Sequence, residues 1–158
     1  MRHAMPIALP AVPPEHWSLS DEGRAAARRL VTLLPADAAF VASDEAKAAQ
    51  TLPSAQLDAR FREVRRRETF SDDFAVARRS YVEGVALPGW EPHVAVVARF
   101  SAGLASYGRP LVVVTHGMAM TVWLAARIGL ADPGAFWAGL RFPDALGVDV
   151  AERRWWRL

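Results

Sequence analysis

The clearest pattern in the chain lies at residues 111–123, where a short apolar run, a polar break and a second apolar segment follow one another. Leu111–Val114 holds four apolar residues, three of them β-branched, which is typical of a strand buried on both faces of a parallel sheet. Gly117 ends the run, and the apolar positions that follow predict a helix to about Ile128. The pattern therefore predicts a strand, a tight turn and a helix, with Thr115 and His116 at the turn.

His116 would lie at the carboxyl end of a central strand and beside a helix amino terminus. Free main-chain amides and the helix dipole favour anions at such a place, and α/β sheets bind ligands there. Taken alone, the position also allows a structural role, in which His116 caps the helix or pairs with a core carbonyl.

The first half of the chain repeats this alternation. Prolines at positions 6, 10, 13 and 14 predict a surface loop over residues 4–17. Ser20 is a good N-cap for a helix that we expect to continue through Leu33 and Leu34 until Pro35 ends it. Residues 38–42 predict a short buried strand, after which Ser43 and Asp44 are expected to cap a second helix that Pro53 ends.

The second half of the chain predicts further elements of both kinds. Residues 61–64 are typical of a short strand, residues 72–85 and 91–107 of helices, and Asp132-Pro133 of a third, short helix. Two strands with a tight turn, at residues 145–150 and 153–157, are expected to close the chain. Strands that alternate with helices predict an α/β fold, a three-layer α/β/α sandwich with a mostly parallel sheet. At 158 residues, one domain spanning 1–158 is the simplest division.

The amino-acid composition excludes several kinds of site and partner. The chain has no cysteine, which excludes disulfides, thiolate nucleophiles and cysteine-ligated metals. Its net charge of +2 is too small an excess to favour nucleic acid as a partner. No apolar run reaches the length of a membrane span, and no signal peptide is recognisable, so we expect no membrane association and a cytoplasmic protein. The sequence leaves the oligomeric state open.

Five short motifs, in order along the chain, resemble the signature of the histidine phosphatase superfamily, the phosphoglycerate-mutase-like proteins. They are Arg2-His3-Ala4, Leu19-Ser20-Asp21-Glu22-Gly23, the segment from Ser43 through Lys47-Ala48-Ala49-Gln50-Thr51, Phe61-Arg62-Glu63, and Val113-Val114-Thr115-His116-Gly117. Each motif is weak alone, but five in the family's order cover nearly the whole chain.

The resemblance implies a role for each motif. His3 would attack phosphorus and form a phosphohistidine intermediate, for which it must be neutral. Arg2, Lys47 and His116 would surround the phosphoryl oxygens, together with the helix amides that follow Gly117. Glu63 would serve as general acid and base, a role that benefits from an elevated pKa. The resemblance implies no cofactor and no metal.

Two alternatives concern the acid. Glu68 is a second candidate for the proton donor, although it lies past the strand-like segment. Glu63 itself could instead be a surface carboxylate that neutralises the basic tract Arg65-Arg66-Arg67, which in turn could rim the pocket and favour polyanionic substrates.

The chain departs from the family pattern in four places. Ala4 replaces a glycine, which is tolerated if φ is negative there. Lys47 replaces an arginine and exchanges a bidentate fork for a point charge, so we expect weaker orientation of phosphate. An asparagine often found after the first histidine is absent. The family normally has a full strand before Arg-His, whereas this sequence begins at Met1, so either the first strand is truncated or the sheet manages without it. Unless another segment fills that place, we expect a fraying His3, exposed edges on two neighbouring strands, and a poorly active and poorly stable protein.

The sequence thus predicts a metal-independent phosphomonoester hydrolase that acts on a small phosphorylated substrate and binds inorganic phosphate. A mutase is less favoured, because mutases of this family are longer and carry an insertion over the site. Alternatives are a phosphohistidine-protein phosphatase and a non-catalytic phosphate-binding or regulatory protein. A basic nucleic-acid-binding domain is weaker still, since the chain lacks the surface that it would need.

Overall fold

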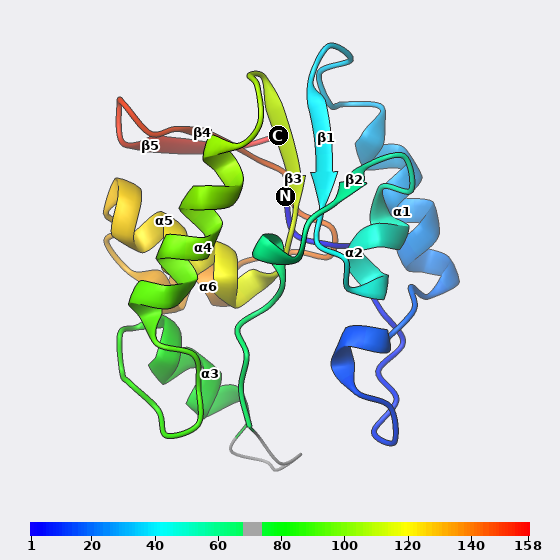
Figure 1. Ribbon diagram of the computed structural model, residues 1–158. Coiled ribbons are helices and arrows are strands. Elements are labelled where there is room, and N and C mark those ends of the chain that lie inside the picture. The colour runs from blue at the N-terminus through cyan, green and yellow to red at the C-terminus, as the bar shows by residue number, and fades with distance from the viewer. Residues whose placement is uncertain (68–73) are drawn as a thin grey trace.

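The centre of the molecule is a parallel sheet of three strands, seen in a computed structural model that describes residues 1–67 and 74–158. Strand β1 (Ala39–Ala42) lies between β2 (Gln56–Leu57) and β3 (Leu111–Val114), with Val41 opposite Gln56 on one side and Val113 on the other (Figure 1). Strands β4 (Leu146–Asp149) and β5 (Arg154–Arg157) form a separate antiparallel pair.

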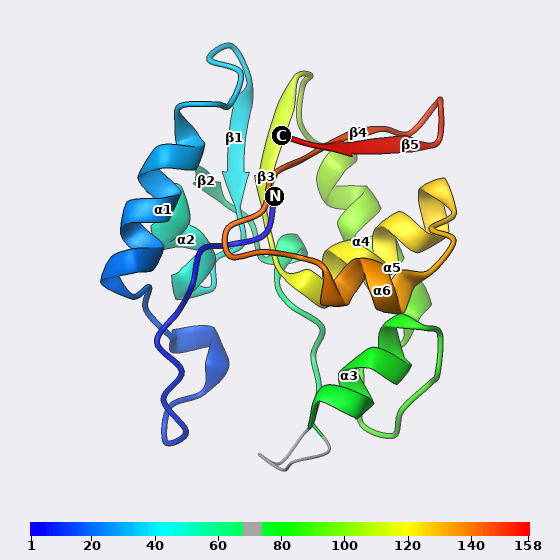
Figure 2. The same cartoon turned by 180° about the vertical axis from the view of Figure 1, so that it is seen from behind.

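Helices cover both faces of the parallel sheet. Helices α1 (Asp21–Val31) and α2 (Ala46–Thr51) lie on one side, and α3 (Phe74–Val82), α4 (His93–Ala105), α5 (Gly117–Ile128) and α6 (Pro133–Ala138) lie on the other, as the two opposite views show (Figures 1 and 2). A hydrophobic core lies on each face of the sheet, and successive strand residues point into one or the other. Val41 and Val113 pack toward α4 and α5, whereas Ala42 and Val114 pack toward α2. The three-layer α/β fold that the sequence predicts is confirmed.

Most of the predicted elements are present, with changes at their ends. Ser20 caps α1 as expected, and its hydroxyl accepts the N–H of Gly23 at 3.0 Å. The helix stops at Val31, however, so Leu33 lies outside it and is exposed. Helix α2 begins later than predicted, because its N-cap is Glu45 and not Ser43 or Asp44. The helix predicted at residues 72–85 is observed as α3, and positions 72 and 73 lie outside the described residues.

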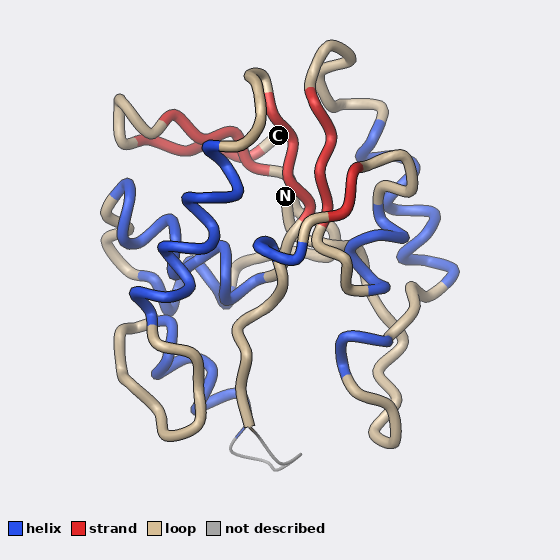
Figure 3. Tube along the Cα trace, viewed as in Figure 1, coloured by secondary structure: helices blue, strands red, loops and turns tan. Residues whose placement is uncertain are grey.

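The strand predicted at residues 61–64 is wrong. Ala59–Phe61 forms a short 3₁₀ helix, and the chain after it runs without regular structure (tan in Figure 3). The physical reason is that side chains satisfy its main chain. Arg99 of α4 donates to the carbonyls of Arg60, Arg62 and Glu63, at 2.7, 2.8 and 3.2 Å.

The first three residues continue the sheet beyond β3. The amino group of Met1 donates to Val113 O, Thr115 N donates to Met1 O, and His3 N donates to Thr115 O. Arg2 pairs in parallel with Thr115 on one side and antiparallel with Asp144 on the other, so it bridges the two sheets. His3 is only 5% exposed. The expectation that His3 lies on a fraying terminus is therefore wrong.

The loop predicted at residues 4–17 is present and contains one 3₁₀ turn, Pro14–His16. Ala4 is fully buried and is not among the described residues with positive φ, so its methyl group is accommodated as expected. In the part of the chain that the structure describes, no helix has the length and apolar character needed to cross a lipid bilayer.

Candidate active site

The two histidines of the predicted site lie side by side. The ring centroids of His3 and His116 are 5.1 Å apart, although the two residues are 113 positions apart in the sequence. His3 follows the bridge that Arg2 makes to Thr115, and His116 is the N-cap residue of α5. Parallel pairing of residues 1–3 with the end of β3 therefore brings both imidazoles to one edge of the sheet.

His3 is oriented by a main-chain contact. Its Nδ1 lies 2.7 Å from Ala4 O, and because a carbonyl can only accept, Nδ1 carries the hydrogen and Nε2 keeps its lone pair. Burial lowers the pKa of His3 well below its usual value, and the cationic neighbours Lys47 and Arg2 lower it further. His3 is therefore neutral at physiological pH, as a nitrogen nucleophile must be.

His116 and Arg2 each carry a buried polar atom without a partner. The Nε2 of His116 lies 2.9 Å from Ser43 Oγ, whereas its Nδ1 is buried and makes no hydrogen bond. The Nε of Arg2 is likewise buried and makes no hydrogen bond. The Nη1 of the same guanidinium donates to Leu140 O at 2.9 Å, and the group stacks 3.3 Å from the ring centroid of Phe142. Buried polar groups normally find partners, so this pair indicates a ligand with acceptor oxygens.

Charge at the site fits such a ligand. Burial lowers the pKa of Arg2 to about 10, which leaves the guanidinium charged at neutral pH. Burial also lowers the pKa of His116 to about 3, so this imidazole is neutral. The fixed cation of Arg2 thus lies beside two neutral imidazoles, a combination that can bind an oxyanion without placing charge on the nucleophile.

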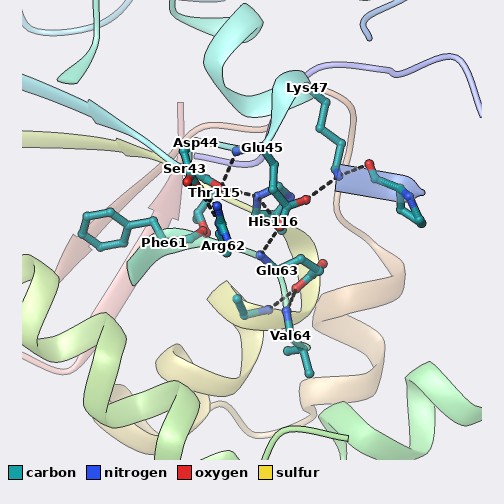
Figure 4. Close-up of polar contacts among 12 residues, drawn as sticks. Ser43, Asp44, Glu45, Lys47, Phe61, Arg62, Glu63, Val64, Thr115 and His116 are labelled. Carbon is teal, nitrogen blue, oxygen red and sulfur yellow. Dashed lines mark hydrogen bonds and ion pairs between the residues drawn. The ribbon is translucent and has the colours of Figure 1, made fainter. Parts of the chain in front are cut away.

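Lys47 enters the same cleft from α2, but its ammonium is already engaged. Its Nζ donates to Glu45 Oε2 at 2.6 Å and to Pro14 O at 2.7 Å (Figure 4). The other oxygen of Glu45 accepts the main-chain N–H of Glu63 at 2.7 Å. Glu45 lines the cleft, and the sequence did not predict it as a site residue. The available signal was an acidic residue two positions before Lys47 in the third motif.

Glu63 lies at the cleft, but its environment differs from the expected one. Its carboxylate accepts the N–H groups of Val64 and Ala119 at 2.9 and 2.8 Å, and that of Met118 at 3.3 Å. Burial would raise the pKa of Glu63, but His116, Arg66 and these amides outweigh it and lower the pKa to about 2. The expectation of an elevated pKa is therefore not met by the protein groups alone.

This contact also corrects the predicted phosphate cradle. The amides of Met118 and Ala119, at the start of α5, point to Glu63, so they do not remain for a phosphate. Gly117 lines the cleft as predicted. Glu68, the alternative acid, lies outside the described residues.

The cleft around these groups has a volume of about 1020 Å³. Its lining includes Val12, Pro13 and Trp17 of the proline-rich loop, and it also includes Arg62, Arg66 and Arg78. Arg66 belongs to the basic tract predicted to rim the pocket, whereas Arg78 of α3 had no sequence signal. Phe142, which fixes Arg2, was also missed, because nothing near it in the sequence marks it.

Motif residues without chemical roles hold the loop that follows His3. Thr51 Oγ1 accepts the N–H of Ala4 at 2.9 Å, and Gln50 Oε1 accepts that of Leu19 at 2.9 Å. Gly23 is needed because α1 packs directly on this loop, and an added Cβ would lie 2.2 Å from Met5 O. In the described ranges 1–67 and 74–158, no three His, Asp or Glu side chains are grouped to hold a metal ion.

No protein-family profile and no curated protein matches the chain. Solved structures do. The protein TTHB049 from Thermus thermophilus superposes with a TM-score of 0.64 at 26% identity, over 84% of this chain and 86% of that one. A point variant of the same protein aligns at 30% identity over 75% of this chain and 76% of that one, with a TM-score of 0.56.

A mycobacterial glucosyl-3-phosphoglycerate phosphatase, Rv2419c, in complex with inorganic phosphate, has a TM-score of 0.67 over 99% of this chain and 92% of that one. At 24% identity this second likeness concerns the fold. Both neighbours are members of the histidine phosphatase superfamily. The chain belongs to this superfamily, in agreement with the resemblance of its motifs.

Proposed function

We propose that the protein is a phosphomonoester hydrolase that works through a phosphohistidine on His3. The observation that carries this proposal is the buried pair of unpartnered atoms, Arg2 Nε and His116 Nδ1, beside a neutral His3 whose Nε2 holds a lone pair. A phosphoryl group offers the acceptor oxygens that both atoms lack and the electrophile that Nε2 can attack.

In the first step, His3 Nε2 attacks phosphorus and the bond from phosphorus to the ester oxygen breaks. Arg2 donates to the phosphoryl oxygens. Ser43 Oγ accepts the N–H of Glu45 at 3.3 Å, so its hydroxyl hydrogen is available to His116 Nε2, which leaves Nδ1–H to donate to the same group. Glu63 transfers a proton to the leaving oxygen. The negative charge of a bound phosphate raises the pKa of this carboxyl, and a substrate monoanion can supply the proton.

In the second step, water attacks phosphorus and the bond to His3 breaks. Glu63, again ionised, accepts a proton from this water, and inorganic phosphate leaves. The same carboxyl group therefore acts first as acid and then as base, and His3 returns to its neutral form.

The size of the cleft supports an organic leaving group. A volume of about 1020 Å³ far exceeds a phosphate ion, and both apolar and basic side chains line the cleft. A phosphorylated compound with both apolar and anionic parts fits this lining. The phosphatase among the structural neighbours, whose name gives a phosphorylated sugar derivative as its substrate, supports a substrate larger than inorganic phosphate.

Release of p-nitrophenol from p-nitrophenyl phosphate tests the proposal. We expect the wild type to turn over, His3→Ala to lose nearly all of this activity, and His93→Gln, which changes a histidine outside the cleft, to retain it. A rapid quench should also trap acid-labile phosphate on the wild type and on His93→Gln, but not on His3→Ala. Equal release by the wild type and His3→Ala would rule out the phosphohistidine route.

One observation favours a second candidate, a non-catalytic phosphate-binding protein. The pKa of Glu63 is lowered to about 2, so without a ligand this carboxyl holds no proton to donate at neutral pH. The ammonium of Lys47 is paired with Glu45 and is not free to act on a substrate alone. A binder would show phosphate affinity by calorimetry that depends on Arg2, with no turnover dependent on His3.

A further inference from the structure

Glu45 lies at the centre of the site, and no role has been assigned to it. Its side chain is 8% exposed and that of Lys47 is 7% exposed, so the two form a buried ion pair. A carboxylate beside an anion-binding site would repel the ligand unless its charge were committed elsewhere. Both of its oxygens are committed: Oε2 accepts from Lys47 Nζ, and Oε1 accepts from Glu63 N.

We propose that Glu45 is a positioning residue, which fixes the ammonium of Lys47 on one side of the phosphoryl group and the backbone of Glu63 on the other. This inference rests on the proposed function. It predicts that Glu45 and Lys47 act as one unit, in which the carboxylate supplies the orientation that a lysine lacks.

The local geometry makes this pairing possible. Residues two apart in a helix do not face each other, but Glu45 is an N-cap residue with extended dihedral angles, φ −68° and ψ 136°. Its side chain can therefore turn back toward Lys47. The carbonyl of Pro14 holds the same ammonium from the proline-rich loop. Two of the three ammonium hydrogens are thus fixed, and the third remains for a ligand.

The contact with Glu63 links the two sides of the site. Glu63 lies in no strand, although Arg65 and Arg66 just after it pair with the main chain of Glu91 and Trp90. The main-chain N–H of Glu63 is held by the side chain of Glu45. Glu45 Oε1 also lies 3.6 Å from His116 Nε2. A change at Glu45 should therefore disturb Lys47 and Glu63 together, and it should alter turnover as well as phosphate binding.

The orientation of a guanidinium at a phosphate depends less on a neighbouring carboxylate than that of an ammonium does. The planar guanidinium fork binds an oxyanion through two parallel hydrogen bonds and carries its own orientation. An arginine at position 47 should therefore tolerate loss of Glu45 better than the native lysine does.

The test compares Glu45→Leu, Glu45→Gln, Lys47→Arg and the double variant Glu45→Leu/Lys47→Arg. We expect Glu45→Leu to lower kcat about 10-fold or more and to weaken inorganic phosphate binding a few-fold, because a displacement of about 1 Å can cost ~100-fold in rate. Glu45→Gln keeps an acceptor and should lose less. The double variant should recover most of the activity, a non-additive result.

Several controls separate this inference from others. Glu83→Gln removes a carboxylate from an exposed ion pair with Arg79, and it should change nothing. Tighter phosphate binding with unchanged kcat in Glu45→Leu and Glu45→Gln would overturn the proposal, because Glu45 would then only repel. Additive effects in the double variant would also overturn it. If the wild type lacks turnover dependent on His3, the hydrolase assignment fails, but calorimetry with inorganic phosphate still tests Glu45.

Discussion

At the scale of single residues, the site depends on close approach. Gly117 begins α5 directly against Arg2 and Trp137, and a Cβ at this position would lie 3.4 Å from Arg2 Nε and 3.2 Å from Trp137 Nε1. The same Nε is one of the two buried atoms that indicate an oxyanion. Gly117 of the fifth motif therefore leaves room for the guanidinium of Arg2 in the first motif, and the sequence does not show this contact.

Gly117→Ala should weaken phosphate binding and reduce kcat/KM by about 10-fold, because the added methyl group would lie 3.2 Å from Trp137 Nε1 and in contact with Arg2 Nε, and the small displacement that relieves the tight contact is costly in a site of this kind. The measurement is steady-state hydrolysis of p-nitrophenyl phosphate with phosphate inhibition. Gly108→Ala is the matched control, since an added Cβ there meets nothing within 4 Å. An unchanged inhibition constant in Gly117→Ala would show that close packing at Gly117 does not set the position of Arg2.

The buried histidines predict how stability depends on pH. Burial lowers the pKa of His116 to about 3, whereas in the unfolded chain it is about 6.5, so the unfolded state takes up the proton first as pH falls. Stability from this group is complete above pH 6.5 and declines below it, by about 1.4 kcal/mol per pH unit. His3, with its pKa lowered in the same direction, adds to the decline.

Urea unfolding between pH 5 and 6.5 should therefore show a shallower dependence on pH in His116→Gln than in the wild type. This window lies above the range in which Glu63, whose folded pKa is lowered to about 2, contributes. His16→Gln, a change at an exposed histidine, should keep the wild-type slope. Identical slopes in all three proteins would mean that His116 is not buried in its neutral form.

At the scale of elements, the most consequential segment has no regular structure. The main chain around Glu63 is held by Arg99 of α4, which donates to three of its carbonyls and pairs with the buried Glu91 at 2.9 Å. Glu91 in turn accepts the N–H of Arg65 at 3.1 Å. Helix α4 therefore positions the carboxylate of the site, although it contributes no residue to the chemistry.

Arg99→Lys should reduce kcat about 10-fold with little change in KM, because lysine keeps a charge for Glu91 but cannot bridge three carbonyls. Circular dichroism should show that the fold is retained. Arg28→Lys, an exposed change on α1, should have wild-type kinetics. A rise in KM with unchanged kcat would assign Arg99 to substrate binding and contradict this role.

At the scale of the whole molecule, Arg2 connects the ends of the two sheets. Arg2 pairs with Thr115 of the parallel side and with Asp144, which leads into β4. The amino group of Met1 is buried beside Val113, and burial lowers its pKa to about 5. Residues placed before Met1 in the same register would run beside Leu111 and extend the contact between the sheets.

A variant with four added apolar residues before Met1 should therefore be more stable and turn over faster than a variant with four Gly/Ser residues there. Thermal unfolding and p-nitrophenyl phosphate hydrolysis provide the two measurements. The added peptide bond also replaces the buried amine, so the loss of stability that this amine causes as pH falls from 8 toward 5 should disappear. Equal stability and turnover in both extended proteins would show that the contact between the sheets is already sufficient.

The sequence alone determined the elements whose signals are local. The apolar run at residues 111–114, the cap at Ser20 and the helix after Gly117 depend on neighbours within a few positions, and all three were predicted and found. The order of the motifs was enough to bring His3 and His116 together, since parallel strands end at one edge of a sheet.

Tertiary structure alone decided the rest, because the partners come from distant parts of the chain. Residues 61–64 resemble a strand, but Arg99 and Glu45 take the hydrogen bonds that a strand partner would make. The pKa of Glu63 is set by helix amides and cations from other elements, and not by its own neighbours in sequence alone. Lys47 was expected to orient phosphate weakly, but its ammonium is fixed by Glu45 and Pro14, a contact that only the folded chain creates.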